Sequence, residues 1–434
     1  MSKRFIHFGC WNNSGCDYKA LDDVIKPSDT ALTRVMKKIK QSIAVGVKPE
    51  FITIAGDNYY SIVKKDKVTQ VKTKILDEAD MISGFMCLPE DIKKYLLIGN
   101  HDLESLSNRP APSVCQILDM QKEMDEDPRN NFEMDNLTSP HIMNTHLSDS
   151  TIIIMLDTSM YSNEKKDLKK VTVCYQRLFE IHGLEKLDDL NTIEKVRALQ
   201  KKRVEAFVVD TVKPNLAKIK NIIVIGHHPM MCFKTKEKED STTGIKKKKT
   251  DTLVMDDLNK LYFDSIYNML KAKQDINYFY LCADLHQYQV GDISIANKTD
   301  KMNIRQYVVG TGGSGLEDLD VDLSLVKPGK EVSIVDTITL TYTNVSNIAT
   351  HGFLDCLLSP RDDFTPIFVE ADMTNFEVKT FKGGYYPKSY TKFMNKTKKG
   401  KKDKKGKNSK TTKKIKSYTK KIKSYKKKKR TVKK

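Results

Sequence analysis

Short apolar runs that end in a turn recur along this chain and most strongly constrain its fold. The runs are Phe5–Phe8, Phe51–Ala55, Tyr95–Ile98, Ile152–Leu156, Ile222–Ile225 and Tyr278–Cys282. Segments with helical periodicity lie between them, and the pattern predicts helices from Ser28, over Lys65–Met86 and over Thr192–Val212. Alternating strands and helices are typical of an α/β domain whose parallel strands are buried on both faces.

The texture of the chain changes after Gln287, where strand patterns follow one another with few helices. These segments are Asn303–Val309, Glu331–Tyr342, Pro366–Glu370 and Asn375–Phe381. They predict an antiparallel portion packed on the first half. Two polar insertions, Leu103–Thr145 and Lys234–Asp251, are expected to be mobile surface loops.

The positive charge of the chain is concentrated at its C-terminal end. The formal net charge is +19, and Lys388–Lys434 holds 24 basic residues and one acid, which is +23; residues 1–387 therefore carry 19 − 23 = −4. The lysine-rich segment cannot bury apolar surface. We therefore predict a folded domain over 1–387 and a disordered basic tail over 388–434. The folded part lacks the basic composition of a nucleic-acid-binding domain.

The cysteines and the N-terminal residues indicate in which cellular compartment the protein is expected. The cysteines are Cys10, Cys16, Cys87, Cys115, Cys174, Cys232, Cys282 and Cys356. They are scattered without a CxxC pair, a pattern that predicts reduced thiols. The first residues have no apolar signal-peptide region, and no long apolar run predicts a membrane span. We expect an intracellular location, in the cytoplasm, the nucleus or a virus particle, and not secretion.

Polar motifs follow four of the apolar runs. They are GDNYY at Gly56–Tyr60, GNHD at Gly99–Asp102, GHHP at Gly226–Pro229 and ADLH at Ala283–His286. The carboxyl ends of strands in an open α/β sheet form its ligand sites. Carboxylate, amide and imidazole donors suit divalent or trivalent first-row metals. Because two neighbouring metals need a shared carboxylate and separate ligands on each side, four converging motifs predict a two-metal site.

In this order the motifs resemble those of the calcineurin-like metallophosphoesterase superfamily. The nearest match is the purple (tartrate-resistant) acid phosphatase branch, because Tyr60 follows Asp57 by three residues. The segments Leu156–Ser159 and Val308–Gly315 are also similar to that branch, and the resemblance extends from about Phe5 to Phe381. It implies a four-layer α/β/β/α sandwich with the metal site at the carboxyl ends of the strands.

The resemblance also implies a set of metal ligands. Asp57 would bridge the two ions, Tyr60 and His286 would bind the first, and Asn100 and His227 would bind the second. The tyrosine would be the phenolate ligand of a trivalent iron. The expected cofactors are therefore two metal ions, iron together with zinc, manganese or a second iron.

Two ligand positions depart from the family pattern. Cys10 stands where the family has the aspartate of its first turn, and Asp284 stands where it has the first histidine of its last turn. A carboxylate at Asp284 still suits Mn²⁺, Fe²⁺ or Mg²⁺ and is less selective for Zn²⁺. Cys10 could be a thiolate ligand, a nearly silent replacement or the mark of a decayed site. If Cys10 is not a ligand, Asp17 and His7 are the alternatives.

The implied activity is hydrolysis of a phosphate ester. A hydroxide activated by the metals would attack the phosphorus, and His101 would contact the phosphate or protonate the leaving oxygen. Monoester and diester substrates both remain open. Because no histidine follows GHHP before Asp251, a lysine of the 234–251 insertion is one source of positive charge for the phosphate. We expect His228 to be a core or supporting residue.

A second function stays open on the sequence alone. The domain could be a weak or inactive phosphoesterase-like module that binds nucleic acid or another polyanion through the 388–434 tail. A nuclear localisation signal or a solubilising extension explains the tail equally well.

Overall fold

The computed structural model describes residues 2–13, 15–66, 72–104, 115–125, 131–134, 141–142, 148–161, 172–176, 192–239, 246–317, 331–335 and 338–371. They belong to one compact unit, Met1–Tyr386. The predicted strand Asn375–Phe381 and the basic tail lie outside the described residues. None of the described helices has the length and apolar character needed to cross a membrane.

Two large sheets form the centre of this unit. The six-stranded sheet has the order β18 (Phe364–Glu370), β17 (Gly352–Leu358), β1 (Lys3–Phe8), β2 (Phe51–Ile54), β5 (Lys93–Leu96) and β6 (Phe132–Glu133). The eight-stranded sheet has the order β15 (Glu331–Val335), β16 (Ile338–Ile348), β13 (Tyr288–Ala296), β14 (Lys301–Val309), β12 (Asn277–Cys282), β9 (Asn221–Ile225), β8 (Thr151–Met155) and β7 (His141–Ile142). Strands β1, β2, β5 and β6 pair in parallel, as do β8, β9, β12 and β14. Strands β13, β15, β16, β17 and β18 pair antiparallel, as the sequence predicted, but they extend both sheets instead of packing on them as a separate portion, and β14 also pairs in parallel with β12.

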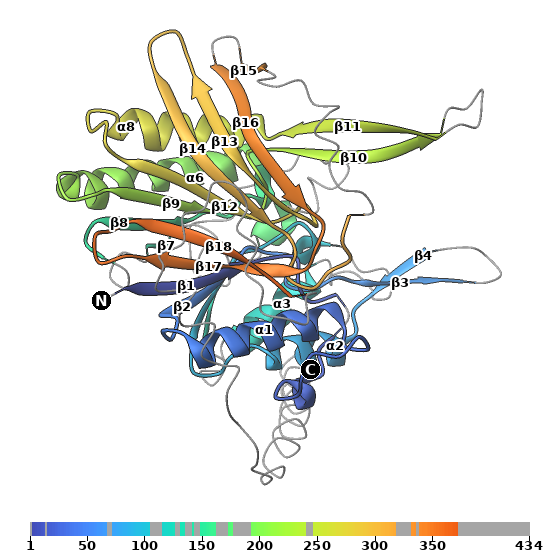
Figure 1. The fold of residues 1–434 in the computed structure, drawn as a ribbon. Helices are drawn as coiled ribbons and strands as arrows, with labels where there is room; N and C mark the ends of the chain where they lie inside the picture. The colour runs from blue at the N-terminus through green and yellow to red at the C-terminus, as the bar shows by residue number, and fades with distance from the viewer. Residues whose placement is uncertain are drawn as a thin grey trace, which may run out of the picture. The chain divides into compact units, whose positions relative to one another are not determined.

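Helices cover the outer faces of both sheets. The α-helices are α1 (Ala31–Val45), α2 (Glu78–Met86), α3 (Gln116–Asp125), α6 (Ile193–Phe207), α7 (Asp256–Tyr262) and α8 (Asn268–Leu270). Short 3-10 or π turns lie at Tyr18–Ala20, His101–Leu103, Ser159–Tyr161, Val208–Val212, Lys213–Asn215 and Phe263–Tyr267. Figure 1 shows α1 and α2 on one outer side and α6 and α8 on the other, with both sheets between them. The predicted four-layer α/β/β/α sandwich is confirmed.

The helix expected over Lys65–Met86 is mostly wrong. The chain forms a hairpin of β3 (Ile62–Lys65) and β4 (Lys72–Ile75) before α2 begins. β-Branched residues in both strands favour extended backbone over helix. The helix starts only after Asp77, whose side chain accepts hydrogen bonds from the first backbone N–H groups of α2.

The insertions expected as surface loops also contain regular structure. Lys234–Asp251 lies within a hairpin of β10 (Met231–Glu239) and β11 (Lys246–Val254), which pair antiparallel along their whole length. The 103–145 insertion contains α3, β6 and β7. High charge suggested loops, but a hairpin satisfies its backbone groups between its own strands and needs little apolar surface.

A buried ion pair joins the two ends of the folded chain inside the six-stranded sheet. Arg4 on β1 donates Nε–H to Asp355 Oδ1 at 2.6 Å and Nη2–H to Oδ2 at 2.9 Å. Its Nη1–H also donates to the carbonyl of Val47 at 2.6 Å, just beyond α1. This two-pronged geometry holds β1, β17 and the end of α1 together, because each remaining donor finds a buried acceptor.

The expectation that the cysteines are reduced thiols is wrong for half of them. Disulfides join Cys16 to Cys87 and Cys115 to Cys174, with Cα atoms 6.3 and 5.5 Å apart. The partners are 71 and 59 residues apart in sequence, so spacing alone could not pair them. Their presence removes the cysteine argument for a reducing compartment. The remaining cysteines are free and buried.

We predict that removing the Cys16–Cys87 bridge costs stability. In the double variant Cys16→Ala/Cys87→Ala, the free energy of unfolding should fall by about 4 kcal/mol, because the unfolded chain regains a long open loop. Urea denaturation with and without dithiothreitol measures this. Reductant should destabilise the wild type more than the double variant, and an equal loss in both proteins would refute the structural role of this bridge.

We also predict a pH dependence that arises from His7. Its ring is fully buried between the sheets and its Nδ1 lies 2.9 Å from Thr53 Oγ1. Burial lowers the pKa of His7 to about 3. In the unfolded chain this imidazole takes up a proton as the pH falls below about 6.5, whereas in the folded chain it stays neutral until about pH 3. The stability that the buried neutral ring contributes is therefore complete above pH 6.5 and is lost as the pH falls towards 3.

The matched variant is His7→Gln, which keeps a hydrogen-bonding side chain and does not titrate. The difference in unfolding free energy between wild type and variant should shrink by about 2.5 kcal/mol between pH 7.5 and pH 4.5. Urea denaturation at both pH values measures it. A difference that stays constant would show that His7 takes up its proton in the folded state.

Candidate metal centre

Five turns meet where the carboxyl ends of β1, β2, β5, β9 and β12 come together, and backbone hydrogen bonds link neighbouring turns in pairs. Cys10 N–H donates to the carbonyl of Gly56 at 3.1 Å, which links the turns after β1 and β2. Gly9 N–H donates to Val309 of the other sheet at 3.1 Å, and Ala283 N–H donates to His227 at 2.8 Å. The positions of the turns therefore depend on one another.

Glycines permit the close approach of two of these turns. Gly56 has φ 82, and a Cβ there would lie 2.6 Å from the backbone nitrogen of Gly99. A Cβ at Gly99 would lie 2.2 Å from the backbone nitrogen of Asp57. Any side chain at either position would push the GDNYY and GNHD turns apart.

Three predicted ligands sit on left-handed backbone. The φ angles are 52 at Cys10, 51 at Asp57 and 58 at Asp284. This conformation costs roughly 1–2 kcal/mol for a residue with a Cβ, although Asp tolerates it better than most. Backbone of this kind concentrates at functional sites, where the surrounding structure holds it in place.

The first cluster contains Cys10, Asp57, Tyr60 and His286. The Tyr60 hydroxyl lies 2.9 Å from Asp57 Oδ2 and 3.0 Å from His286 Nε2, and Cys10 Sγ lies 3.6 Å from the same carboxylate oxygen. Potential ligand atoms of Cys10, Asp57 and His286 all lie within 4.8 Å of one another. Burial and the nearby Asp57 charge raise the pKa values of the Cys10 thiol and the Tyr60 phenol. A cation among these groups would favour their anionic forms.

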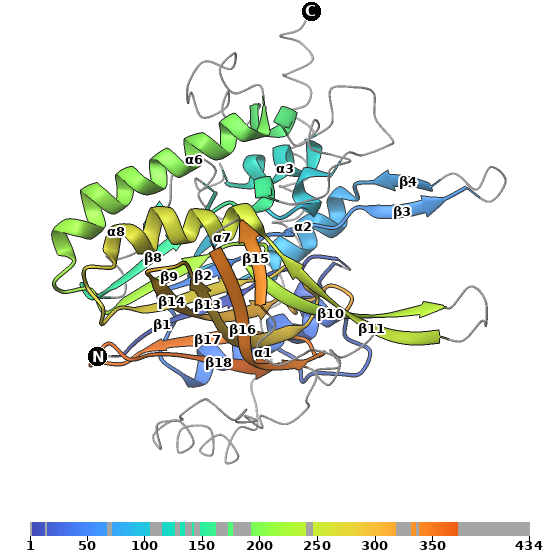
Figure 2. The ribbon, with the colours of Figure 1, turned by 90° about the horizontal axis from the view of Figure 1, so that it is seen from above.

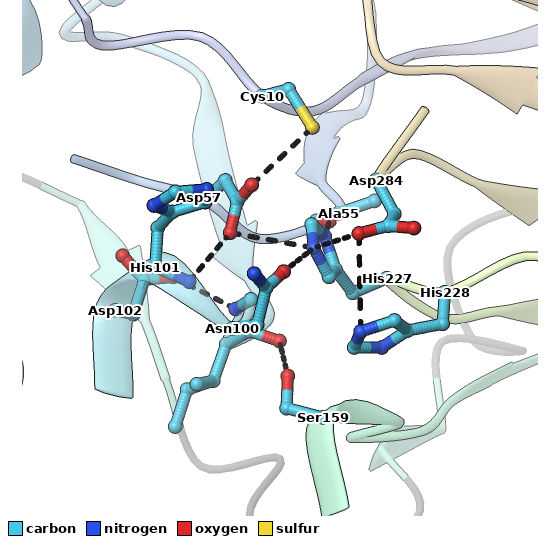
Figure 3. A network of polar contacts seen from close by, with 12 residues as sticks. Cys10, Ala55, Asp57, Asn100, His101, Asp102, Ser159, His227, His228 and Asp284 are labelled. Atoms are coloured by element: carbon cyan, nitrogen blue, oxygen red, sulfur yellow. Dashed lines mark hydrogen bonds and ion pairs between the residues drawn. The ribbon is translucent and has the colours of Figure 1, made fainter. Parts of the chain in front are cut away.

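The second cluster is arranged around His227. Its Nδ1 lies 2.6 Å from the carbonyl of Ala55, an acceptor, so this nitrogen carries the proton and Nε2 is left with a lone pair. Nε2 faces acceptor oxygens, at 2.9 Å from Asn100 Oδ1, 3.3 Å from Asp57 Oδ1 and 3.6 Å from Asp284 Oδ1 (Figure 3). Acceptors that converge in this way require a cation among them or a doubly protonated ring.

The residues present fit two metal ions. Asp57 is fully buried and offers one carboxylate oxygen to each cluster, Oδ2 to the first and Oδ1 to the second. The first cluster adds thiol, phenol and imidazole donors, and the second adds amide, imidazole and carboxylate donors. These donor types suit first-row transition metals.

The sequence did not single out His228 as a metal-binding residue. Its Nε2 lies 3.9 Å from Asp284 Oδ1, and possible ligand atoms of His227, His228 and Asp284 lie within 4.8 Å of one another. Burial lowers the pKa of His228 to about 4, so its ring is neutral. Neighbouring residues in a sequence rarely face the same site. The tertiary structure was therefore needed to show that both histidines of GHHP face the second cluster.

His101 borders the first cluster and is held by a glutamate that the sequence did not reveal. His101 Nδ1 lies 2.9 Å from Glu104 Oε1, and its ring centroid lies 4.4 Å from that of Tyr60. Burial opposes a charge on His101, but the carboxylates of Asp57 and Glu104 raise its pKa to about 9. The imidazole is therefore protonated at neutral pH. The sequence signal that could have revealed Glu104 is its position three residues after His101, since one turn of helix places such residues side by side.

Glu104 also receives hydrogen bonds from Ser61 Oγ at 2.6 Å and Lys74 Nζ at 2.5 Å. Burial opposes ionisation of Glu104, but its contacts with His101, Lys74 and Ser61 lower its pKa to about 2. The glutamate is thus a permanent anion that orients the histidine.

A buried aspartate supports the GNHD and GDNYY turns. Asp102 accepts hydrogen bonds from the backbone of Gly99 at 2.8 Å and of Asn58 at 2.9 Å, and from Gln121 Nε2 at 2.7 Å. Burial and the neighbouring Asp57 charge raise the pKa of Asp102 to about 7. It fixes the spacing of the two turns and lies behind the potential ligand atoms.

The segments Leu156–Ser159 and Val308–Gly315, which resemble the phosphatase branch, support the GHHP turn and the turn at Cys10. Thr158 Oγ1 accepts the backbone N–H groups of His227 at 2.9 Å and His228 at 2.8 Å. The backbone N–H of Gly312 donates to Gly9 at 3.0 Å, and that of Ser314 donates to Cys10 at 3.0 Å. Both segments therefore hold ligand-bearing backbone in place.

The structure brings all eight predicted site residues to this one edge. They are Cys10, Asp57, Tyr60, Asn100, His101, His227, Asp284 and His286. Neither alternative to Cys10 belongs to a cluster. Asp17 is exposed and caps the turn that begins at Tyr18, and His7 contacts Thr53 between the sheets.

Comparisons with known proteins agree with this arrangement. The model of the calcineurin-like phosphoesterase family matches residues 3–287, which is more than half of the chain and includes every motif turn. The comparison with curated protein sequences gave no match.

The comparison with solved structures gave matches of low sequence identity. A purple acid phosphatase from seeds of yellow lupin (Lupinus luteus) has a TM-score of 0.44 and 10% identity, covering 87% of this chain and 53% of that one. The structure of PhoD has a TM-score of 0.40 and 12% identity, covering 91% and 76%. The phosphopantetheinyl hydrolase of Mycobacterium tuberculosis has a TM-score of 0.27 and 10% identity, covering 72% and 90%.

The chain thus spans about half the length of the lupin phosphatase. The family match covers the five turns that carry the potential ligands, and the family expected from the motifs is confirmed. The chain belongs to the calcineurin-like phosphoesterase family.

Proposed function

We propose that the chain is a two-metal hydrolase of phosphate esters, of the acid-phosphatase type. The observation that carries this proposal is the buried carboxylate of Asp57, whose two oxygens face two separate sets of donors. A shared carboxylate between two ligand sets is what a pair of neighbouring metals requires.

The first ion would be held by Cys10, Asp57, Tyr60 and His286, and the second by Asp57, Asn100, His227 and Asp284. When bound, the ions supply Lewis acidity towards a phosphoryl oxygen and lower the pKa of water. The phenol and thiol donors within the first set support a trivalent iron there, as the resemblance to purple acid phosphatases implies. The second set suits iron, manganese or zinc.

His101 would supply the proton. Glu104 Oε1 lies 2.9 Å from its imidazole Nδ1 and favours the protonated ring, and its backbone N–H donates to Asp57 Oδ1 at 3.0 Å. A protonated imidazole beside the metal ligands can neutralise the phosphate and protonate the leaving oxygen. Neither role distinguishes a monoester from a diester.

The second function drawn from the sequence, polyanion binding through residues 388–434, stays a prediction, because those residues lie outside the described part of the chain. The domain division at 387 and an intracellular location also stay predictions.

We predict that Asp57→Asn abolishes most phosphatase activity. The amide removes the negative charge that both ligand sets share, so kcat/KM for p-nitrophenyl phosphate should fall at least about 100-fold after reconstitution with Fe, Mn or Zn. Asp292→Asn is the matched control, since Asp292 pairs with Arg305 on β13 and β14 outside the site. If wild type and Asp57→Asn hydrolyse the ester at the same background rate with every metal, the proposal that the chain is a phosphatase is wrong.

We further predict that Cys10 distinguishes a working first site from a relic. Cys10→Ala should weaken Fe³⁺ binding about 10-fold or more if the thiolate is a ligand, whereas Cys10→Asp should restore or raise affinity. Equilibrium dialysis with metal analysis measures both. Unchanged affinity in Cys10→Ala would mean that the thiol is a silent replacement.

A further inference from the structure

Two hairpins leave the sandwich directly from the metal centre. Strand β3 begins at Ile62, two residues after Tyr60, and β10 begins at Met231, three residues after His228. Figures 1 and 2 are views at right angles, and in both the β3–β4 and β10–β11 hairpins project from the same side of the two sheets. The site turns therefore lie at the bases of both hairpins.

A lysine at the base of each hairpin is tied to a site histidine through a glutamate. On β4, Lys74 pairs with Glu104 at 2.5 Å, and Glu104 contacts His101. On β10, Lys234 pairs with Glu317 at 2.6 Å, and the Glu317 backbone N–H donates to the carbonyl of His286 at 2.9 Å. These contacts fix the hairpin bases against the two sides of the site.

The hairpins are basic, whereas the rest of the domain is acidic. Residues 62–75 contain five lysines and one acid, a charge of 5 − 1 = +4, and residues 231–254 contain seven lysines and four acids, a charge of 7 − 4 = +3. Since residues 1–387 carry −4, the domain without its hairpins carries −4 − 7 = −11. Because the two hairpins are basic and the remainder of the domain is acidic, a polyanion is attracted to the side on which the hairpins lie.

Among the hairpin side chains that the structure describes, five lysines are exposed and available to such a polyanion: Lys64, Lys65, Lys72, Lys248 and Lys249. Lys249 pairs with Asp251, but its side chain stays 67% exposed. The described side chains of these hairpins include no exposed aromatic residue on which a base could stack. Lysine without exposed aromatics favours contacts with phosphates over contacts with bases.

We propose that the β3–β4 and β10–β11 hairpins bind the phosphate backbone of a nucleic-acid strand and guide a phosphate ester of that strand into the metal centre. The proposal rests on the proposed function and adds the substrate class. Nine residues of β10 span about 30 Å, enough for several nucleotides. The recognition is electrostatic and independent of base sequence.

The test compares full-length proteins. The hairpin variant replaces Lys64, Lys65, Lys72, Lys248 and Lys249 with Gln, and the control variant replaces Lys195, Lys201, Lys202, Lys213 and Lys218 with Gln. The control lysines are also exposed, on α6 and the turn after it. Both variants lose the same charge and keep residues 388–434, so the contribution of that segment cancels in the comparison.

Each protein is assayed with p-nitrophenyl phosphate and with a 5′-phosphorylated oligothymidylate of 20 nucleotides. The hairpin variant should keep kcat/KM for the small ester within about twofold and raise KM for the oligonucleotide about 10-fold. Its log(kcat/KM) against log[KCl] should be less steep by about 3.5, since five lysine–phosphate contacts are lost at roughly 0.7 each. The control variant should match the wild type.

Binding of fluorescent oligothymidylate in EDTA, followed by anisotropy, separates this proposal from the proposed function. If no protein hydrolyses either ester, the proposed function fails, and weaker binding by the hairpin variant alone still supports the hairpins. Equal oligonucleotide binding by hairpin and control variants overturns the proposal. Inorganic polyphosphate is tested in the same binding assay. If the hairpin variant binds polyphosphate more weakly but binds oligothymidylate as the wild type does, the assignment to nucleic acid is overturned.

Discussion

The buried carboxylate of Asp57 is the constraint around which this domain is organised. It accepts the backbone N–H of His101 and the hydroxyl of Tyr60, and it faces Cys10 and His227 from the other turns. A carboxylate without water is costly unless donors or cations surround it. Turns from both sheets must therefore meet at this point, and the strands that carry them must keep their register.

The backbone accepts strain to achieve this. Three potential ligands occupy left-handed conformations, and two glycines allow a separation between turns that no other residue would permit. Asp102 and Thr158 then hold the turns by accepting their backbone N–H groups. Both supporting side chains are fully buried, so packing limits their rotamers and their acceptor atoms hold the turns in place.

The histidines are oriented by acceptors on their far side. Ala55 fixes the tautomer of His227 through its carbonyl, and Glu104 holds the imidazole of His101. Lys74 on β4 pairs with Glu104, and Lys234 on β10 pairs with Glu317, so a separate ion pair holds the base of each hairpin beside the site.

The sequence by itself determined the strand–turn pattern, the family and the residues that gather at the sheet edge. It did so because parallel strands place their carboxyl ends together, and the motif residues follow those ends directly. Only the tertiary structure decided what depends on distant contacts: the Cys16–Cys87 and Cys115–Cys174 bridges, the Glu104 support of His101 and the inward direction of His228. It also decided that the start of the segment expected as a helix over Lys65–Met86 and the charged insertion Lys234–Asp251 both form hairpins, since cross-strand pairing within a charged segment leaves no apolar periodicity to detect. Cys10 shows both contributions. Its place in the first turn was evident from the motif, whereas its contact with Asp57 depends on the parallel pairing of β1 with β2, which brings the two turns together.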